Sequence, residues 1–150
     1  DVLGMLLLNS DNILKQSVVA VFDLFTKYHK ENRAHVEGWK TNERWKVGRK
    51  VILPNYVRYE CGGFGTAYGR YSEYSDIDKA LCYLAGKQLE DILTIEKAIK
   101  PHENTSESEF FTMRYFQKGT LHLTFKDESL WAKFNQVACD GRNWLGGGHD

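Results

Sequence analysis

The sequence predicts an α+β fold in which about four helices pack on a small antiparallel sheet. Apolar residues recur at helical spacing near both ends of the chain, and they alternate strictly on either side of a glycine turn at Gly119. At most one strand–helix–strand crossover is indicated, which argues against a doubly wound parallel sheet. The length of 150 residues is typical of one domain. We therefore expect residues 1–150 to form a single α+β domain.

The first half of the chain is expected to contain one long helix followed by strands. Ser10 is a good N-cap, and Leu14, Val18, Val21 and Phe25 follow at helical spacing, which predicts a helix over about 11–30. Residues 46–53 are predicted to form a strand that Pro54 ends, and residues 56–59 a second strand. The pair of glycines at 62–63 then breaks the chain, and 64–71 is expected to be a bent strand or a loop.

Two helices and a loop are predicted next. The pattern from Ser75 to Asp78 resembles a capping box, so a helix is expected to start there and to end at Gly86. A further helix over about 88–100 is predicted to end at Pro101, and 102–108 to be a polar loop. Near the end of the chain, Asp127 is expected to cap a helix over about 128–139.

Residues 110–126 give the strongest local prediction, a β-hairpin. Apolar residues alternate from Phe111 to Tyr115 and again from Leu121 to Phe125. A three-residue loop at 117–119, with Gly119 at positive φ, places all six apolar side chains on one face, whereas a two-residue turn would oppose apolar residues to charged ones. The opposite face then carries the polar side chains Thr112, Arg114, His122 and Thr124.

Composition narrows the class of protein. The chain has 20 basic and 20 acidic residues. This balance excludes a protein that coats nucleic acid with a uniformly positive surface. No apolar run approaches the roughly 18 residues that a membrane span needs. The three cysteines are odd in number and lack a short CxxC spacing, which favours reduced thiols and a cytoplasmic protein. Because the chain begins with Asp1, we expect a module of a longer protein, and we expect 146–150 to be a disordered tail.

The charges are unevenly distributed. Residues 33–58 hold seven basic and two acidic side chains, whereas residues 71–109 hold nine acidic side chains and four lysines. Cations neutralise phosphates and aromatic rings stack on unpaired bases, so the basic segment is a candidate nucleic-acid site. The alternative is a solvated face with core tryptophans. The candidate binding residues are Trp39, Lys40, Arg44, Trp45, Lys46, Arg49, Lys50, Arg58 and Tyr59.

Two other groups of residues invite a functional interpretation. A tyrosine-rich patch of Tyr68, Arg70, Tyr71 and Tyr74 is either a surface for a protein partner or the sheet face under the helices.

Separately, three side chains would suit a metal-dependent nuclease, in which carboxylates hold the ion and a base activates water. They are Asp76, Asp78 and His122, although helix capping also accounts for the two aspartates.

Motifs for cofactor chemistry are absent from the sequence. It contains no P-loop, no G-x-G-x-x-G before a helix, no G-x-S-x-G and no H-E-x-x-H. We therefore expect no cofactor and no resident metal. The balance of these observations favours a binding module over an enzyme.

Two blocks of the sequence resemble a known family. One runs from Gly38 through Pro54 to the stretch 71–81, and the other is F-Q-K-G-T-L-H-L-T-F at 116–125 followed by a helix with Asn135. Over about 10–145 the chain resembles the DUF4942 family of uncharacterised phage, prophage and mobile-element domains, some of which are attached to S-adenosylmethionine-dependent methyltransferases. The resemblance implies an accessory domain that acts on nucleic acid, or one that docks on a methyltransferase or a host-defence protein. It supplies no catalytic residues.

Overall fold

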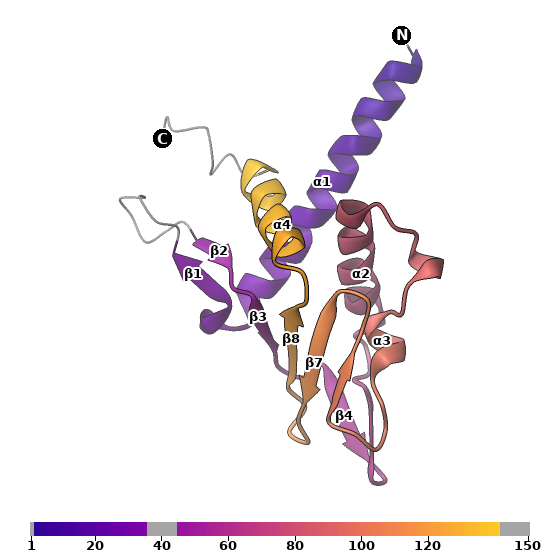
Figure 1. Cartoon of the computed structure of the whole chain (residues 1–150), viewed down its shortest axis with the longest axis vertical. Coiled ribbons are helices and arrows are strands. Elements are labelled where there is room, and N and C mark those ends of the chain that lie inside the picture. Colours follow the sequence, from indigo (N-terminus) through magenta and orange to yellow (C-terminus); the bar gives the residue numbers. More distant parts are fainter. Residues whose placement is uncertain (1, 36–44, 142–150) are drawn as a thin grey trace.

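The computed structural model describes residues 2–35 and 45–141 of the chain. It begins with the long helix α1 (Val2–Tyr28) and ends with the helix α4 (Glu128–Gly141), and Figure 1 shows the elements between them. In chain order these are η1 (Lys30–Asn32), β1 (Arg33–His35), β2 (Trp45–Val47), β3 (Lys50–Leu53), β4 (Val57–Glu60), β5 (Gly63–Thr66), α2 (Tyr71–Ala85), η2 (Leu89–Asp91), α3 (Ile95–Ala98), β6 (Thr105–Glu107), β7 (Phe111–Tyr115) and β8 (Leu121–Phe125).

The centre of the fold is a four-stranded antiparallel sheet with the strand order β3-β8-β7-β6. Two smaller antiparallel pairs, β1–β2 and β4–β5, lie outside it. The prediction of an α+β fold with helices on a small antiparallel sheet is therefore confirmed.

The register of the β7–β8 hairpin is the predicted one. Phe111 lies opposite Phe125, Met113 opposite Leu123, and Tyr115 opposite Leu121. All six side chains are buried on one face. Gly119 has a φ of +107°, and a Cβ there would lie 3.2 Å from the carbonyl oxygen of Val57, so the turn requires glycine.

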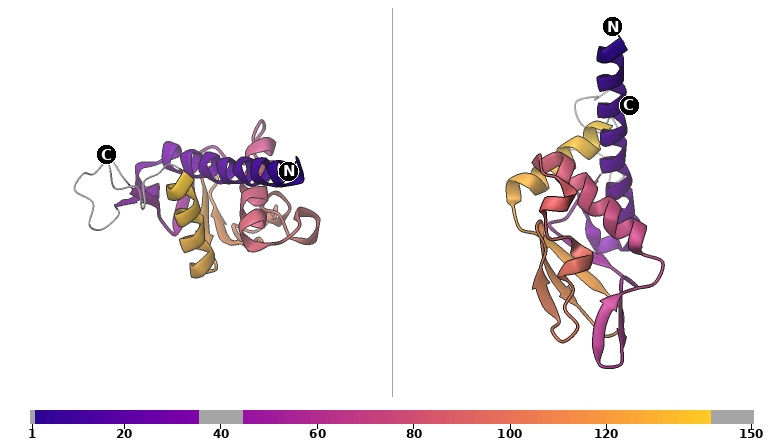
Figure 2. Two further views of the ribbon diagram at one scale, coloured as in Figure 1. Left: turned by 90° about the horizontal axis from the view of Figure 1, so that it is seen from above. Right: turned by 90° about the vertical axis from the view of Figure 1, so that its right-hand side faces the viewer.

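The helices cover the buried face of the sheet. α1 packs against α4 and α2 and also against β3, and Figure 2 shows this arrangement from two further sides. The rings of Phe22 and Phe25 on α1 contact the ring of Phe134 on α4, which in turn packs on Phe125 of β8. The first turns of α1 project beyond the other elements (Figures 1 and 2). No helix in the described ranges has the length and apolar composition that a membrane crossing needs.

Several boundaries in the first half differ from the prediction. α1 begins at Val2, so Ser10 is a helical residue and not an N-cap. The predicted strand 46–53 is two strands, because the chain turns at Gly48, whose N–H donates to the carbonyl of Asn32. The predicted tail at 146–150 lies outside the described residues.

The second half also contains corrections. α2 begins at Tyr71 and not at Ser75, so Asp76 and Asp78 are interior helix residues and neither is a cap. Residues 88–100 are not one helix: Thr94 accepts a hydrogen bond from the N–H of Lys97 and starts the separate turn α3. Part of the predicted loop 102–108 is the edge strand β6. The helix end at Gly86, with a φ of +69°, and the helix after Asp127 are confirmed.

Candidate functional site

Polar side chains gather on the face of the central sheet that the helices leave uncovered. Strand alternation turns Lys50, Thr112, Arg114, His122 and Thr124 away from the core, and register places Arg114 opposite His122 and Lys50 opposite Thr124. Lys118 lies in the β7–β8 turn, next to Arg114 and close enough to His122 for its charge to act on that ring. We call these six residues the open face. Five of them, with Met113, line a shallow hollow of about 190 Å³.

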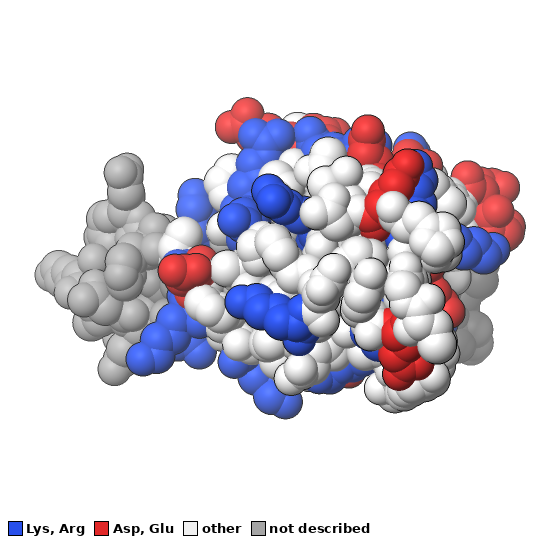
Figure 3. Space-filling model, turned by 90° about the horizontal axis from the view of Figure 1, so that it is seen from below, with Lys and Arg blue, Asp and Glu red and all other residues white. Residues whose placement is uncertain are grey.

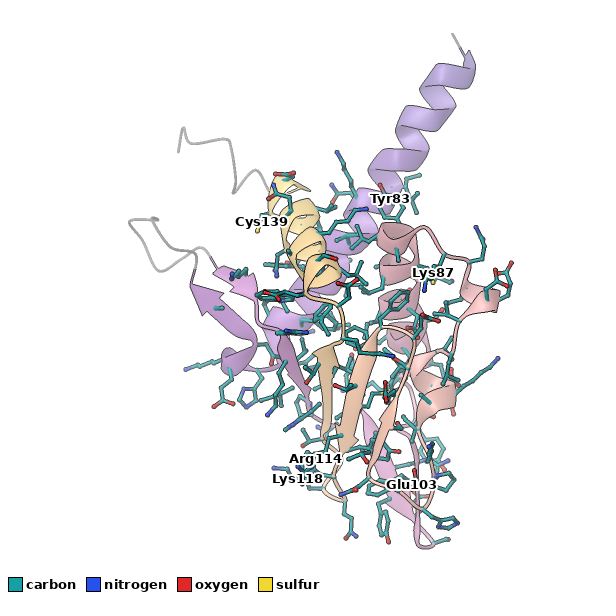
Figure 4. All side chains as sticks on the ribbon, viewed as in Figure 1. Tyr83, Lys87, Glu103, Arg114, Lys118 and Cys139 are labelled. Atoms are coloured by element: carbon teal, nitrogen blue, oxygen red, sulfur yellow. The ribbon has the colours of Figure 1, made fainter. Side chains whose placement is uncertain are left out.

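The open face is positively charged. In the described part of the chain, no carboxylate lies within 4.0 Å of the side-chain nitrogens of Lys50, Arg114 or Lys118. Figure 4 shows Arg114 and Lys118 close together at the lower end of the hairpin. In Figure 3, which views that end from below, Lys and Arg side chains lie over the centre and left half, and most Asp and Glu side chains lie on the right half and upper edge. The open face can therefore attract an anion.

An aromatic ring joins the two central side chains of the open face. The guanidinium of Arg114 lies 5.3 Å from the ring centroid of Phe116, and the His122 ring lies 4.8 Å from the same ring. Burial lowers the pKa of His122, and the positive charges of Lys50, Arg114 and Lys118 lower it further. His122 is therefore neutral at pH 7 in the unliganded chain.

Among the residues that the structure describes, the basic segment predicted from the sequence is divided between several surfaces. Trp39, Lys40 and Arg44 lie outside the described residues, and Trp45 belongs to β2. Lys46 lies over the ring of Trp131 on α4, with 4.9 Å between its Nζ and the centroid. Of the predicted cations that the structure describes, Lys50 is the one on the open face.

Three more of the predicted binding residues lie away from the open face. Arg49 donates to the carbonyls of Phe125 and Lys126. On the β4–β5 hairpin, Arg58 donates to the carbonyl of Thr66 and pairs with Glu60. Tyr59 packs on Phe64, with 4.8 Å between the ring centroids.

The binding residues predicted from the sequence do not include Arg114 or Lys118, which the structure places beside each other. Arg114 was correctly assigned to the polar face of the hairpin, but it is distant in sequence from the basic segment. The signal that would have found the site is the hairpin register itself, because that register places Arg114 and His122 on one face, and the same face carries Lys50 from β3.

The tyrosine-rich patch is divided between the surface and the interior. Tyr68 and Tyr71 are exposed, whereas Tyr74 is buried and its hydroxyl donates to the carbonyl of Tyr56. Arg70 donates to Glu73 and to the hydroxyl of Tyr28, both at 2.7 Å. Arg70 and Tyr74 therefore hold α2 against α1 and the β3–β4 turn. Tyr68 and Tyr71 lie at the surface, where the guanidinium of Arg58 is 4.7 Å from the centroid of the Tyr68 ring.

The three candidate metal ligands do not meet. Asp76 is exposed on α2, and Asp78 is buried in the same helix, where its Oδ2 accepts from the N–H of Ile95 at 2.9 Å. His122 lies on the other side of the sheet. Within residues 2–35 and 45–141, no three His, Cys, Asp or Glu side chains come close enough to hold a metal ion together.

The fold and site together define a class of protein: a small α+β domain with a basic, aromatic face on an antiparallel sheet. The chain belongs to the DUF4942 family, a family of domains of unknown function whose model matches residues 1–144. Comparisons with curated proteins and with solved structures found no match.

Proposed function

We propose that this domain binds nucleic acid with the open face of its sheet. The observation that carries the proposal is that Lys50, Arg114 and Lys118 follow one face of the sheet, from Lys50 opposite Thr124 to Lys118 in the β7–β8 turn, without carboxylate partners in the described residues. Cations of this kind contact phosphates, and an antiparallel sheet presents them to an extended strand. Phe116 and His122 add ring surfaces among the cations, and rings stack on bases.

The test is fluorescence anisotropy with labelled single-stranded DNA, duplex DNA and RNA at several salt concentrations. Lys50→Glu/Lys118→Glu is expected to weaken binding by about tenfold or more and to reduce the salt slope by roughly 0.7 for each single-strand phosphate that is no longer neutralised. The matched control is Lys15→Glu/Lys79→Glu, which makes the same charge change at exposed positions of α1 and α2. Equal loss in both variants, or no binding at low salt, contradicts the proposal.

Docking of a protein partner is the second candidate, and the exposure of Tyr68 and Tyr71 favours it. Their side-chain surfaces are 69% and 49% exposed, which is high for tyrosines beside a packed core. A methyltransferase or a host-defence protein is the partner class that the family resemblance suggests. Such binding would depend little on salt and would be lost in Tyr68→Ala/Tyr71→Ala, whereas Lys50→Glu/Lys118→Glu would leave it unchanged.

A further inference from the structure

A pocket of about 650 Å³ lies next to the open face. The β4–β5 hairpin forms one side of it, residues 101–105 a second side, and the end of the β7–β8 hairpin the third. Four aromatic residues line it: Tyr59, Phe64, Tyr115 and Phe116. Phe116 also contacts Arg114 and His122, so the pocket and the open face share a wall.

Hydrogen bonds and ring contacts hold the walls of this pocket in place. The N–H of Phe64 donates to the carbonyl of Pro101 at 2.9 Å, which ties the β4–β5 hairpin to the 101–105 segment. The hydroxyl of Tyr115 accepts from the N–H of Lys100 at 2.9 Å. The rings of Phe64 and Tyr115 meet edge to face, with 4.9 Å between their centroids. These contacts hold the aromatic walls of the pocket in place before a ligand binds.

The chemistry of the lining has two parts. Tyr59 offers a surface on which a flat ring can stack, because this residue is 39% exposed, and Phe64 and Phe116 are half-buried beside it, whereas Tyr115 is fully buried and supports the wall from behind. The remaining lining includes the amides of Asn104 and Gln117 and the carboxylate of Glu103, which donate and accept hydrogen bonds. A planar group with a polar edge matches this combination, and a nucleobase is such a group.

The charges determine how a nucleotide would be oriented. Figure 4 shows Arg114 and Lys118 on one side of the lower end of the molecule and Glu103 on the other. Glu103 is paired with Lys100 at 3.2 Å, so that side offers a phosphate no free cation, whereas Arg114 and Lys118 have no carboxylate partner in the described residues and attract one. The backbone therefore belongs on the side of the open face, and the base points toward Tyr59 and Phe64.

We infer that the pocket takes one unpaired base of a single strand whose phosphates lie along Arg114 and Lys118. This inference rests on the proposed function and narrows its ligand to single-stranded nucleic acid. A base within a duplex is stacked and paired, so it cannot enter the pocket without leaving the helix. A single strand can present its bases outward at little cost.

The experiment compares Tyr59→Ala with the unchanged chain on a labelled single strand, on the same strand carrying one abasic site, and on the corresponding duplex. Tyr59→Ala is expected to weaken single-strand binding by about tenfold, which is the range for removing one base–aromatic stack. The salt slope is expected to stay the same, because every phosphate keeps its cation. Tyr71→Ala, which removes an exposed tyrosine of α2, is the matched control and is expected to have no effect.

A second readout locates the base directly. A 2-aminopurine placed in the strand is expected to lose fluorescence on binding the unchanged chain and to recover it with Tyr59→Ala. Three results would overturn the inference: equal affinity for single strand and duplex, an unchanged affinity in Tyr59→Ala, or an unquenched probe at every position. In each case, a loss of affinity in Lys50→Glu/Lys118→Glu would still support nucleic-acid binding by the open face. Absence of all binding would reject both the proposed function and the inference about the pocket.

Discussion

Asn135 on α4 forms two hydrogen bonds with the backbone of Val47 on β2. Its Oδ1 accepts from the N–H of Val47 at 2.8 Å, and its Nδ2 donates to the carbonyl of Val47 at 3.0 Å. Asn135 is 7% exposed and Val47 is fully buried. The Asn135 amide thus satisfies both the backbone donor and the backbone acceptor of Val47, as a residue of a neighbouring strand would. Asn32 does the same for Ile52, with bonds of 2.7 and 2.8 Å.

Replacing Asn135 with alanine is therefore expected to destabilise the fold. The N–H of Val47 would stay buried without a partner, which costs about 1–3 kcal/mol. Urea denaturation followed by circular dichroism measures the loss. Gln136→Ala is the control, because Gln136 is exposed and bonds only to Asp140 among the described residues. Equal free energies of unfolding for Asn135→Ala and the unchanged chain would show that the two bonds contribute nothing.

The parts of the fold that sequence reasoning predicted correctly depend on local patterns. The register of the β7–β8 hairpin follows from alternation over adjacent residues together with one glycine. The end of α2 follows from the positive φ at Gly86. Each of these patterns lies within a few neighbouring residues. The local sequence therefore determines the structure there, and contacts with distant residues do not change it.

The parts that were missed depend on partners far along the chain. Asp78 was interpreted as a cap, but its hydrogen-bond partner is Ile95, which only the packing of α3 on α2 supplies. The charge pattern of 39–59 predicts one surface, but within the described part of this segment β4 pairs with β5 in a separate sheet, which carries Arg58 and Tyr59 away from Lys50. Arg114 and Lys118 join Lys50 because β3 pairs with β8, a pairing that no local pattern contains.

The hydroxyl of Tyr56 is expected to stabilise the fold through Glu73. It donates to Oε1 of Glu73 at 2.6 Å, and Tyr28 and Arg70 donate to the same carboxylate. Burial would raise the pKa of Glu73, but these three hydrogen bonds outweigh burial and hold that pKa below its ordinary value. Tyr56→Phe is therefore expected to cost about 1.5–3 kcal/mol of unfolding free energy. Thermal denaturation tests this, with the exposed Tyr71→Phe as the control; an equal melting temperature for the two variants would contradict it.

Asp78 is expected to make the stability depend on pH. Burial raises its pKa to about 7, and one carboxylate oxygen has no hydrogen-bond partner. The folded chain therefore binds this proton more tightly than the unfolded chain, whose aspartate has its ordinary pKa of 3.8. The resulting stabilisation is present at low pH and is lost as the pH rises through about 7.

Asp78→Asn removes this titration while keeping an oxygen acceptor for the N–H of Ile95. The unfolding free energy of the unchanged chain, minus that of Asp78→Asn, is expected to fall by on the order of 2 kcal/mol between pH 5 and pH 8. Taking the difference cancels the titration of His122, which both chains share. Asp76→Asn, at an exposed position of α2, is expected to give a difference that does not change with pH. A pH-independent difference for Asp78→Asn would refute the assignment.

His122 is expected to link nucleic-acid binding to proton uptake. Burial and the cations around it lower its pKa, so the free chain holds the ring neutral, and the folded state loses stability as the pH falls below the ordinary histidine value of 6.5. A phosphate placed on Lys50, Arg114 and Lys118 adds negative charge beside the ring and raises its pKa. Binding then takes up a proton, and affinity rises as the pH falls from about 7.5 toward 5.5.

Anisotropy titrations at constant ionic strength measure this effect, and an oligothymidine probe avoids protonation of the bases. His122→Gln keeps a polar side chain on β8 but cannot gain a charge, so its affinity is expected to change less with pH over the same range. The Lys50→Glu/Lys118→Glu variant is expected to lose the pH dependence together with the affinity, because the phosphate no longer lies beside the ring. Identical pH profiles for His122→Gln and the unchanged chain would place the bound phosphates away from β8 and would therefore count against the open face as the binding surface.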